Sequence, residues 1–294
     1  MGQPRVGIVV LTYNGLRDTV ECLESLRRLA YPSYEVLVVD NVSTDGTAAV
    51  LRKDFPEAAI ISVPPPNRGF APGMNAGLRE ALRRGYDYIF AINNDTTIDP
   101  ACLAELVAVM ERHPEAGCVS PTVYYDGDPG TMWQAGQREP FRRFWIDFST
   151  RQRGQDSEYQ VDIITGTALL LRPAALRSAG LFAEDYYMYY EDFDLCLRFK
   201  RCGYQVWCAP RARLWHKISA TYGGSKNPVI SFYKARNIIL LLRRFYPWYL
   251  VTLLPFYGAM IAANFVRAAF VRRRLETFWA LLRGFGYHFR HNHR

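Results

Sequence analysis

The chain has 294 residues, of which 49% are hydrophobic and 14% aromatic, and this composition excludes an intrinsically disordered protein. Its length fits one large domain, or one domain with an appendage. The formal net charge of +8 comes from the stretch after residue 242, which holds nine Arg and one acidic residue; the 27 basic and 27 acidic side chains before it balance, which excludes a nucleic-acid-binding face on the main body.

Predicted strands and helices alternate in the first part of the chain. Apolar, β-rich runs predict strands at 6–11, 34–39, 59–63 and 88–92. Helix-starting residues and helical periodicity predict helices that follow Gly15 and Gly46 and that begin near Pro72 and Pro100. This alternation is typical of βαβ units, so we expect an α/β fold with a mostly parallel sheet flanked by helices.

The middle of the chain is less regular. Gly, Pro, Arg and aromatic residues dominate 124–159, and we expect this stretch to face a substrate. A strand is expected over 161–171, around Thr165-Gly-Thr167, and a helix over 191–200.

The C-terminal tail is apolar and basic. Phe245–Val266 is a run of 22 residues without a charge, long enough for one membrane span. Pro and Gly interrupt this run and Arg lies on both sides, which favours helices lying on an anionic membrane surface; a single span and a buried helical pair in a soluble oligomer are the alternatives. We therefore expect a catalytic domain at 1–230 and a helical, membrane-associating tail at 231–294.

Two features indicate the compartment. The six cysteines contain no CxxC pattern, so we expect reduced, buried thiols and no zinc site. Residues 1–5 lead directly into the first predicted strand, so we expect no signal peptide. Together with the tail, these features predict a cytoplasmic protein at the inner face of a membrane.

Polar residues follow the predicted strands abruptly. The apolar run at 88–92 ends in Asn93-Asn-Asp95, and the run at 34–39 ends in Asp40-Asn-Val-Ser43. Ligands of open α/β sheets bind beyond the carboxyl ends of the strands. We therefore expect one crevice lined by Thr12-Tyr-Asn14, Asp40-Asn-Val-Ser43, Asn67-Arg-Gly69 and Asn93-Asn-Asp95.

The residue types in this crevice favour a nucleotide diphosphate. Neither a GxGxxG after the first strand nor a Walker motif is present, which excludes a dinucleotide Rossmann site and a P-loop NTPase. Asp40 can accept a base imide N–H or a ribose hydroxyl, Arg68 can pair with diphosphate oxygens, and Asp95 can hold a divalent cation that bridges them. The structural alternative for Asp95 is a turn residue that precedes a helix.

Several short motifs stand in the order found in glycosyltransferase family 2 enzymes of the GT-A fold. They are Val9-Val-Leu-Thr-Tyr-Asn14, Val39-Asp-Asn-Val-Ser-Thr-Asp-Gly46, Asn67-Arg-Gly-Phe-Ala71 with Asn75 and Gly77, Asn93-Asn-Asp95, Thr165-Gly-Thr167, Tyr190-Glu-Asp-Phe-Asp194 and Trp215-His216. Over about residues 5–240 the chain resembles this family, particularly its rhamnosyltransferase-like branch. The resemblance implies a GT-A-like α/β domain and a dTDP-, UDP- or GDP-linked sugar as donor.

The resemblance also implies a set of site residues. Nucleotide binding would fall to Thr12, Tyr13, Asn14, Asp40, Ser43, Arg68, Gly69, Asn75 and Asn94, and acceptor binding to Thr165, Gly166 and Thr167. The metal-binding Asp-x-Asp of the family reads Asn93-Asn-Asp95 here, so Asp95 would bind Mn²⁺ or Mg²⁺ with one anionic ligand fewer, and His216 would be the second ligand.

By the same resemblance, Asp192, supported by Glu191 or Asp194, would remove the proton from the acceptor hydroxyl. Each of these residues also has a structural alternative. Acidic residues are routine at the start of a helix, and a lone His such as His216 is often structural. The aromatic run at 186–190 fits acceptor stacking and core packing equally well.

With the resemblance, which alone implies inversion, these observations predict an inverting glycosyltransferase that moves a sugar from a nucleotide-diphosphate sugar to a hydroxyl of a glycan acceptor, one linked to a lipid, in cell-surface polysaccharide synthesis. A sugar-nucleotide pyrophosphorylase is one alternative, but its Gly-rich N-terminal signature is missing where Thr12-Tyr-Asn-Gly15 stands. A non-catalytic scaffold that binds nucleotide sugars at the membrane is the other, and it would not need Asp95 and Asp192.

Overall fold

The computed structural model describes residues 2–137, 157–217, 227–250 and 272–290. The chain forms two compact units. The sheet unit comprises Met1–Glu184 and Glu191–Ile218, and the helical unit comprises Asp185–Tyr190 and Ser219–Arg294. The short segment Asp185–Tyr190 therefore belongs to the helical unit although it lies between two stretches of the sheet unit in the sequence.

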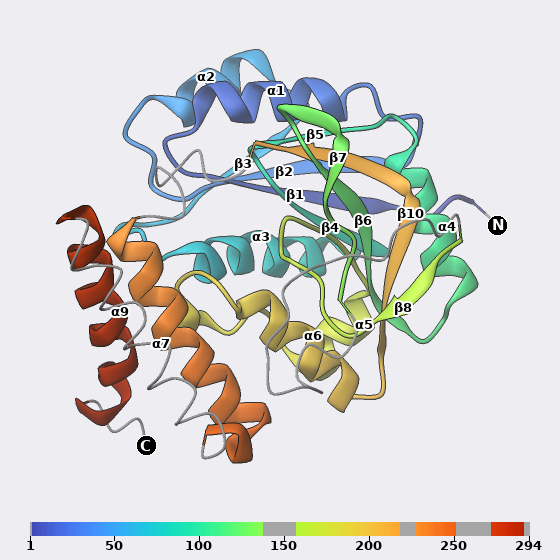
Figure 1. The fold of residues 1–294 in the computed structure, drawn as a ribbon. Helices are drawn as coiled ribbons and strands as arrows, with labels where there is room; N and C mark the ends of the chain where they lie inside the picture. Colours follow the sequence, from blue (N-terminus) through green and yellow to red (C-terminus); the bar gives the residue numbers. More distant parts are fainter. Residues whose placement is uncertain (1, 138–156, 218–226, 251–271, 291–294) are drawn as a thin grey trace. The chain divides into compact units, whose positions relative to one another are not determined.

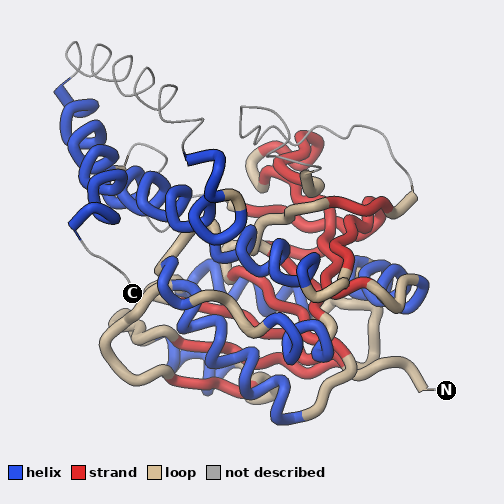
Figure 2. The backbone as a smooth tube through the Cα atoms, turned by 90° about the horizontal axis from the view of Figure 1, so that it is seen from below, coloured by secondary structure: helices blue, strands red, loops and turns tan. Residues whose placement is uncertain are grey.

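One mixed sheet of ten strands accounts for the strands in the described residues of the sheet unit (Figure 1). Its order is β3-β2-β1-β4-β9-β6-β10-β5, with β7 paired to β6 and β8 paired to β10. The strands are β1 Val6–Thr12, β2 Tyr34–Asp40, β3 Ala59–Ser62, β4 Tyr88–Asn93, β5 Thr96–Ile98, β6 Ala116–Tyr125, β7 Asp128–Gln134, β8 Tyr159–Val161, β9 Ala168–Leu171 and β10 Gln205–His216. Figure 2 shows the strands of this unit as a continuous layer.

Helices cover both faces of this sheet. The helices of the sheet unit are α1 Leu16–Leu26, α2 Thr47–Asp54, α3 Phe70–Arg84, α4 Cys102–Arg112, α5 Pro173–Ala179 and α6 Glu191–Arg201. Side chains of β1 alternate between two hydrophobic clusters, because successive residues of a strand point to opposite faces. Val6, Ile8 and Val10 pack with α1, α2 and α4, whereas Val9 and Leu11 pack with α3, in a cluster that also contains residues of α5 and α6.

Close approach of α3 to the sheet depends on Gly77. A Cβ atom at this position would lie 2.3 Å from Cγ1 of Val9 and 2.7 Å from Cγ2 of Val39. The glycine therefore lets α3 pack directly on β1 and β2, whose carboxyl ends form the candidate site.

The predicted α/β fold is confirmed, with several differences in its elements. β1, β2, β3 and β4 pair in parallel as expected, and parallel pairs hold most of the paired residues of the sheet; β9, β5, β7 and β8 pair antiparallel to their neighbours. β5, β7 and β10 were not expected from the sequence. The strand expected over 161–171 is wrong in extent: β8 ends at Val161, β9 begins at Ala168, and Thr165-Gly-Thr167 lies between them.

The helical unit contains the helices α7 Pro228–Phe245 and α9 Arg272–Arg290, which pack against each other. At Gly284 of α9, a Cβ atom would lie 2.4 Å from the carbonyl oxygen of Phe232, so the two helices touch at backbone distance. Most of the uncharged run at 245–266 lies outside the described residues, as does much of the stretch at 124–159. Among the residues that the structure describes, no helix is both long enough and apolar enough to cross a lipid bilayer.

Candidate active site

The carboxyl ends of β1, β2 and β4 meet as the sequence predicts. β1 lies between β2 and β4 in parallel register, which sets Thr12 beside Asp40 and Leu11 beside Asn93. The Asn94 amide donates to Thr19 Oγ1 at 3.0 Å, and the hydroxyls of Thr19 and Thr12 are 2.8 Å apart. These bonds tie the end of β4 to the end of β1 and the start of α1.

A second set of hydrogen bonds joins the loops after β1 and β2. The Asn14 backbone N–H donates to Ser43 Oγ at 3.0 Å, and Asn14 Oδ1 accepts from the Thr44 N–H at 2.7 Å. Asp40, only 6% exposed, accepts from the Ser43 N–H at 3.2 Å. Asn14 and Val42 have left-handed backbone angles, φ 47° and 70°; Asn adopts this conformation readily, but a β-branched residue such as Val42 adopts it only when its surroundings hold it. The predicted nucleoside-binding residues thus form one preorganised pair of loops, beside which Tyr13 is 38% exposed.

The loop before α3 is joined to this pair by Asn41, a residue that the sequence analysis did not single out. Asn41 Nδ2 donates to the Gly69 carbonyl at 3.0 Å, and Asn67 Nδ2 donates to the Asn41 carbonyl at 3.0 Å. Arg68 is exposed between Asn67 and Gly69, so its guanidinium is available to a charged ligand. An amide directly after the strand-end Asp40 was the signal that could have identified Asn41.

Asn75 occupies a different environment from the other predicted nucleotide-binding residues. It is 1% exposed, its Nδ2 donates to the Phe182 carbonyl at 2.8 Å, and its Oδ1 accepts from the Phe182 N–H at 3.0 Å. The same Nδ2 donates to Glu184 at 3.0 Å, and this bond is the largest of the interactions that lower the pKa of the Glu184 carboxyl. The described contacts of Asn75 therefore hold the chain before residue 185, and a contact with nucleotide stays a prediction.

Asp95 and His216, the two predicted metal ligands, lie side by side. His216 Nε2 is 3.1 Å from Asp95 Oδ1, and both side chains are largely buried. Their proximity results from β5, which follows Asp95 and pairs antiparallel with the end of β10, so that His216 stands opposite Thr96. The Lys217 N–H also donates to the Asp95 carbonyl at 3.0 Å.

The residues present fit a divalent cation that takes its other ligands from substrate and water. Carboxylate oxygen and imidazole nitrogen both suit manganese, and two adjacent ligands of an octahedral ion at about 2.1 Å lie about 3 Å apart. Asn93 Oδ1 and His216 Nδ1 are buried without a hydrogen-bond partner among the described residues. Among the described residues, no third His, Cys, Asp or Glu joins the pair, so a cation held there would have two ligands of this type.

The predicted acceptor segment links this strand end to Asp192. The Asn93 N–H donates to the Thr167 carbonyl at 2.9 Å, and the Gly166 N–H donates to Asp192 Oδ2 at 2.7 Å. The Thr165 hydroxyl donates to Gln134 of β7, another residue that the sequence analysis did not identify. One three-residue turn thus holds the end of β4 on one side and the carboxylate at the start of α6 on the other.

Burial controls the charge of the two acids at the start of α6. Burial raises the pKa of Asp192 to about 6, although the Gly166 and Phe193 N–H groups act in the opposite direction by hydrogen bonding to its carboxylate. Burial, followed by the charge of Asp192, raises the pKa of Glu191 well above its ordinary value. Glu191 Oε2 has no hydrogen-bond partner among the described residues. Asp192, whose two oxygens are oriented by backbone N–H groups, is the better-placed proton acceptor.

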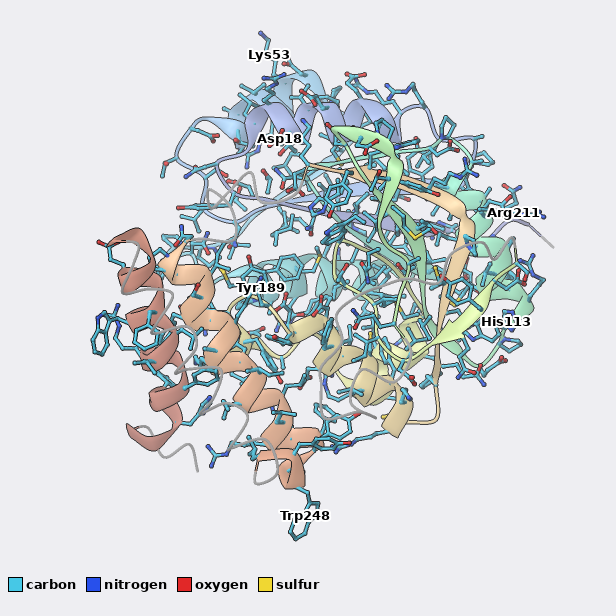
Figure 3. The ribbon with its side chains drawn as sticks, in the orientation of Figure 1. Asp18, Lys53, His113, Tyr189, Arg211 and Trp248 are labelled. Carbon is cyan, nitrogen blue, oxygen red and sulfur yellow. The ribbon has the colours of Figure 1, made fainter. Side chains whose placement is uncertain are left out.

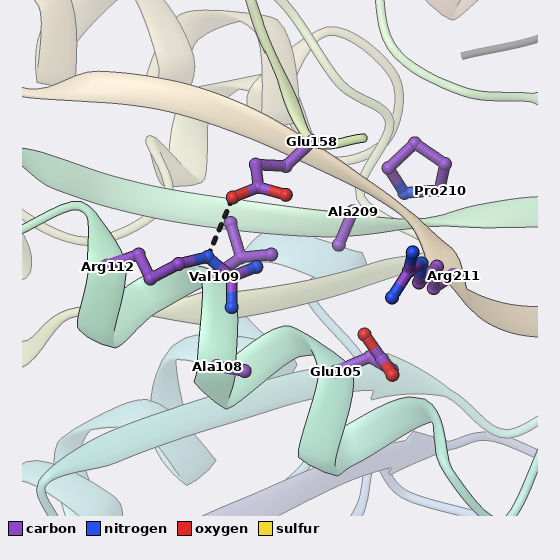
Figure 4. Close-up of a pocket in the computed structure, with 8 residues that line it drawn as sticks. All are labelled: Glu105, Ala108, Val109, Arg112, Glu158, Ala209, Pro210 and Arg211. Carbon is purple, nitrogen blue, oxygen red and sulfur yellow. Dashed lines mark hydrogen bonds and ion pairs between the residues drawn. The ribbon is translucent and has the colours of Figure 1, made fainter. Parts of the chain in front are cut away.

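A cavity of about 360 Å³ lies elsewhere in the sheet unit, between α4, β8 and β10 (Figure 4). Its lining includes the Arg112–Glu158 ion pair, together with Glu105 and Arg211. None of the predicted site residues lines it, and its charged groups of both signs do not form a pattern that selects a ligand.

Comparison of the sequence with known protein families shows to which family the chain belongs. The sequence model described as glycosyl transferase family 2 matches residues 7–178, more than half of the chain. The chain belongs to glycosyl transferase family 2. The resemblance expected from the motifs is therefore confirmed, and the ends of β1, β2 and β4 lie within the matched region, whereas Asp192 and His216 lie beyond it.

Relatives of this family 2 chain include an N-acetylglucosaminyl-diphospho-decaprenol L-rhamnosyltransferase of Mycobacterium tuberculosis, which is 24% identical over 82% of this chain and 85% of its own length. Two solved structures share the fold. One is GalNAc-T7 with UDP, GalNAc and Mn²⁺, with a TM-score of 0.64 and 13% identity over 80% of this chain and 47% of that chain. The other is the mannosyltransferase PcManGT of Pyrobaculum calidifontis with GDP-Man and Mn²⁺, with a TM-score of 0.61 and 19% identity over 97% of this chain and 88% of that chain.

Proposed function

We propose that this family 2 protein is an inverting, metal-assisted glycosyltransferase that moves a sugar from a nucleotide-diphosphate sugar to a hydroxyl of a lipid-linked glycan. The observation that supports this proposal is the turn at Thr165-Gly-Thr167. It joins the strand end that leads to Asp95 to the carboxylate of Asp192 by hydrogen bonds of 2.9 and 2.7 Å. Transfer of a sugar requires the donor and the catalytic base to be held close together. This turn would hold both the donor-binding end of β4 and the base Asp192.

In the proposed reaction, the acceptor oxygen forms a bond to the anomeric carbon of the donor while the bond from that carbon to the diphosphate breaks. The hydroxyl proton goes to the carboxylate of Asp192, and the nucleoside diphosphate leaves with the electron pair of the broken bond. The Gly166 and Phe193 N–H groups keep both carboxylate oxygens oriented. Arg68 is the exposed cation beside the donor loops that would pair with the diphosphate.

Asp95 and His216 would hold the divalent cation, Mn²⁺ or Mg²⁺. The cation would neutralise charge on the leaving diphosphate. Two backbone interactions orient these ligands. β5 pairs with β10 and so sets His216 beside Asp95, and the Lys217 N–H donates to the Asp95 carbonyl. The Mn²⁺ bound in both similar solved structures supports this assignment.

The acceptor and the location are part of the same proposal. The rhamnosyltransferase relative is named for an acceptor that carries diphospho-decaprenol, which supports a lipid-linked acceptor. A basic, apolar tail suits an enzyme that meets such an acceptor at the cytoplasmic surface of an anionic membrane. The tail would therefore bring the catalytic domain to its substrate.

Thermal shift with UDP, GDP and dTDP, each with Mn²⁺ or with EDTA, tests the donor half of this proposal. A ligand at 100 times its Kd should stabilise the protein by about 2.7 kcal/mol.

Asp192→Asn tests the base: turnover should fall by about 10²–10⁴-fold while the nucleotide shift is kept. Asp162→Asn, which alters an acid that pairs with Lys200, is the matched control and should keep turnover. A wild-type protein that binds nucleotide and never transfers sugar would instead be a scaffold.

A further inference from the structure

The segment Asp185–Tyr190 has an unusual backbone. Tyr187, Tyr189 and Tyr190 all adopt left-handed angles, with φ 64°, 67° and 72°. Residues with a large side chain are rarely found in this region, and they remain there only when neighbouring groups hold them. Tyr190 is joined by one peptide bond to Glu191, the first residue of α6. The segment is therefore the part of the chain that leads directly into α6.

One side chain of α7 holds this backbone. Asn237 is completely buried, and its Nδ2 donates to the carbonyls of Tyr186, Met188 and Tyr189 at 2.8, 2.7 and 3.0 Å. Buried carbonyl groups are costly to leave unpaired, and of these three the Tyr186 carbonyl also accepts from the Met188 N–H at 2.8 Å. The two N–H bonds of the Asn237 amide are shared among these three carbonyls, so at least one N–H is divided between two of them.

Arg236 fixes the orientation of the Asn237 amide. It donates to Asn237 Oδ1 at 2.7 Å and to the Asp185 carbonyl at 2.8 Å. Because Oδ1 faces a guanidinium, the amide cannot rotate to present oxygen to the three carbonyls without losing this bond. Arg236 is in turn held by α9, where His288 Nε2 lies 2.8 Å from the Arg236 carbonyl.

Rings of the segment also pack on α7. Tyr187 stacks on Tyr233, with ring centroids 4.8 Å apart and planes inclined by 14°. The Lys234 ammonium lies 4.9 Å from the centre of the Tyr189 ring; Figure 3 labels Tyr189. The segment is thus held by both its backbone and its side chains, and α7 supplies the partners.

We propose that Asn237 is a positioning residue of the transferase: it fixes the backbone of Tyr186–Tyr190, the segment joined by one peptide bond to the helix that carries the base Asp192. This inference rests on the proposed function, because it assumes the role of Asp192. It assigns to the tail helix a task within catalysis in addition to membrane association. A displacement of a catalytic group by about 1 Å can cost about 100-fold in rate, so this support matters for turnover.

The test compares Asn237→Leu, which has similar size and no donor, with Leu241→Ala. Leu241 is completely buried on the same helix, one turn further along, and its side chain has no hydrogen-bonding group. Amide hydrogen exchange is measured over residues 185–193 of the full chain, together with kcat and the thermal shift by UDP, GDP and dTDP. In Asn237→Leu we expect exchange in this segment to rise about tenfold or more and kcat to fall about tenfold or more, with nucleotide shifts unchanged. Leu241→Ala should destabilise the helix pair through the cavity that it leaves, but keep kcat close to wild type.

Asn237→Ser keeps one hydroxyl donor and should give intermediate values; it also covers the case in which the leucine variant does not fold. Unchanged exchange or unchanged kcat in the Asn237 variants would overturn the proposal. Equal loss of kcat in Leu241→Ala would overturn it as well, because the effect would then be general destabilisation. If the wild-type protein transfers no sugar from any donor, the proposed function fails, and the exchange measurement by itself decides whether Asn237 holds the segment.

Discussion

At the scale of single residues, the charge of Asp192 decides when it can accept a proton. Its pKa is raised to about 6 mainly by burial, so the neutral acid persists to higher pH than in an ordinary Asp. A base must be deprotonated, and activity is therefore lost as the pH falls through this value. We expect kcat/KM to be constant above pH 7 and to fall about tenfold per pH unit below about 6. A profile that is flat from pH 5 to 7.5 would contradict the role of Asp192 as the base.

The pair Asp95–His216 leads to a prediction on metal affinity. Removal of one of two protein ligands should weaken Mn²⁺ binding, and His216→Ala should raise the Mn²⁺ concentration needed for half-saturation by about 10–100-fold. Free Mn²⁺ measured by electron paramagnetic resonance in the presence of UDP reports this without an activity assay. Lys217→Met is the matched control, because the adjacent Lys217 side chain pairs with Asp18 and Glu21 and not with the metal pair. Equal Mn²⁺ affinity in wild type and His216→Ala would show that His216 only orients Asp95.

Much of the candidate site was predictable at this scale, for a physical reason. Polar residues directly after apolar parallel strands must gather at one edge of the sheet, so Asp40 and Asn94 were found from local sequence alone. Asn41 and Gln134 were missed because their roles depend on partners far along the chain, Gly69 and Thr165. The role of Asn237 was missed for the same reason: in the sequence it is one amide in a basic, apolar helix.

At the scale of elements, β1 to β4 were predictable from the sequence, whereas β5, β7 and β10 were not. β5 has only three residues, too few for a periodic pattern. β10 did carry a signal, because exposed Arg211 and Arg213 alternate with buried Ala212 and Leu214, a period of two that is typical of a strand. β5 and β10 pair with each other, and this pairing brings His216 beside Asp95. Two strands that the sequence did not predict therefore bring the two predicted metal ligands together.

Contact between α7 and α9 leads to a prediction with an internal control. A Cβ atom at Gly284 would lie 2.4 Å from the Phe232 carbonyl and 2.9 Å from the Ala235 Cβ, whereas one at Gly286 would meet nothing within 4 Å. Gly284→Ala should therefore destabilise the helix pair by about 1–3 kcal/mol through overpacking. Gly286→Ala should be neutral or stabilise by up to about 1 kcal/mol, since alanine favours the helix. Hydrogen exchange of α7 and α9 amides measures both, and equal protection in the two variants would contradict this packing.

At the scale of the whole molecule, the division into two units changes the interpretation of the tail. The sequence predicted a catalytic domain to residue 230 and a separate tail, and this division stays a prediction. The helical unit, however, includes Asp185–Tyr190, so the last quarter of the chain forms one unit with a segment that directly precedes α6 in the sequence. Sequence periodicity could not show this, because a segment of six residues that joins a distant helix leaves no local pattern.

Membrane association can be tested on two tryptophans of the helical unit. Trp248 is 82% exposed and Trp279 is 56% exposed, and Figure 3 shows Trp248 extending away from the ribbon. Aromatic rings of this kind gain free energy at the level of lipid head groups, while Arg side chains attract anionic lipids. We expect the full chain to bind vesicles that contain anionic lipid, and to bind less as salt increases.

Trp248→Ala and Trp279→Ala should each weaken vesicle binding by about tenfold, because about 1–2 kcal/mol of apolar burial is lost per ring. Tyr125→Ala is the control, since Tyr125 is an exposed aromatic residue of the sheet unit, 39% exposed. Vesicle co-sedimentation at several salt concentrations measures all three variants. Equal binding of the tryptophan variants and wild type would contradict insertion of these rings.

Transfer to a water-soluble acceptor should be unaffected by either tryptophan change, because the contacts of Asn237 with Tyr186, Met188 and Tyr189 do not involve the two tryptophans. The tail would then have two separable tasks, one at the membrane and one in holding the segment Tyr186–Tyr190.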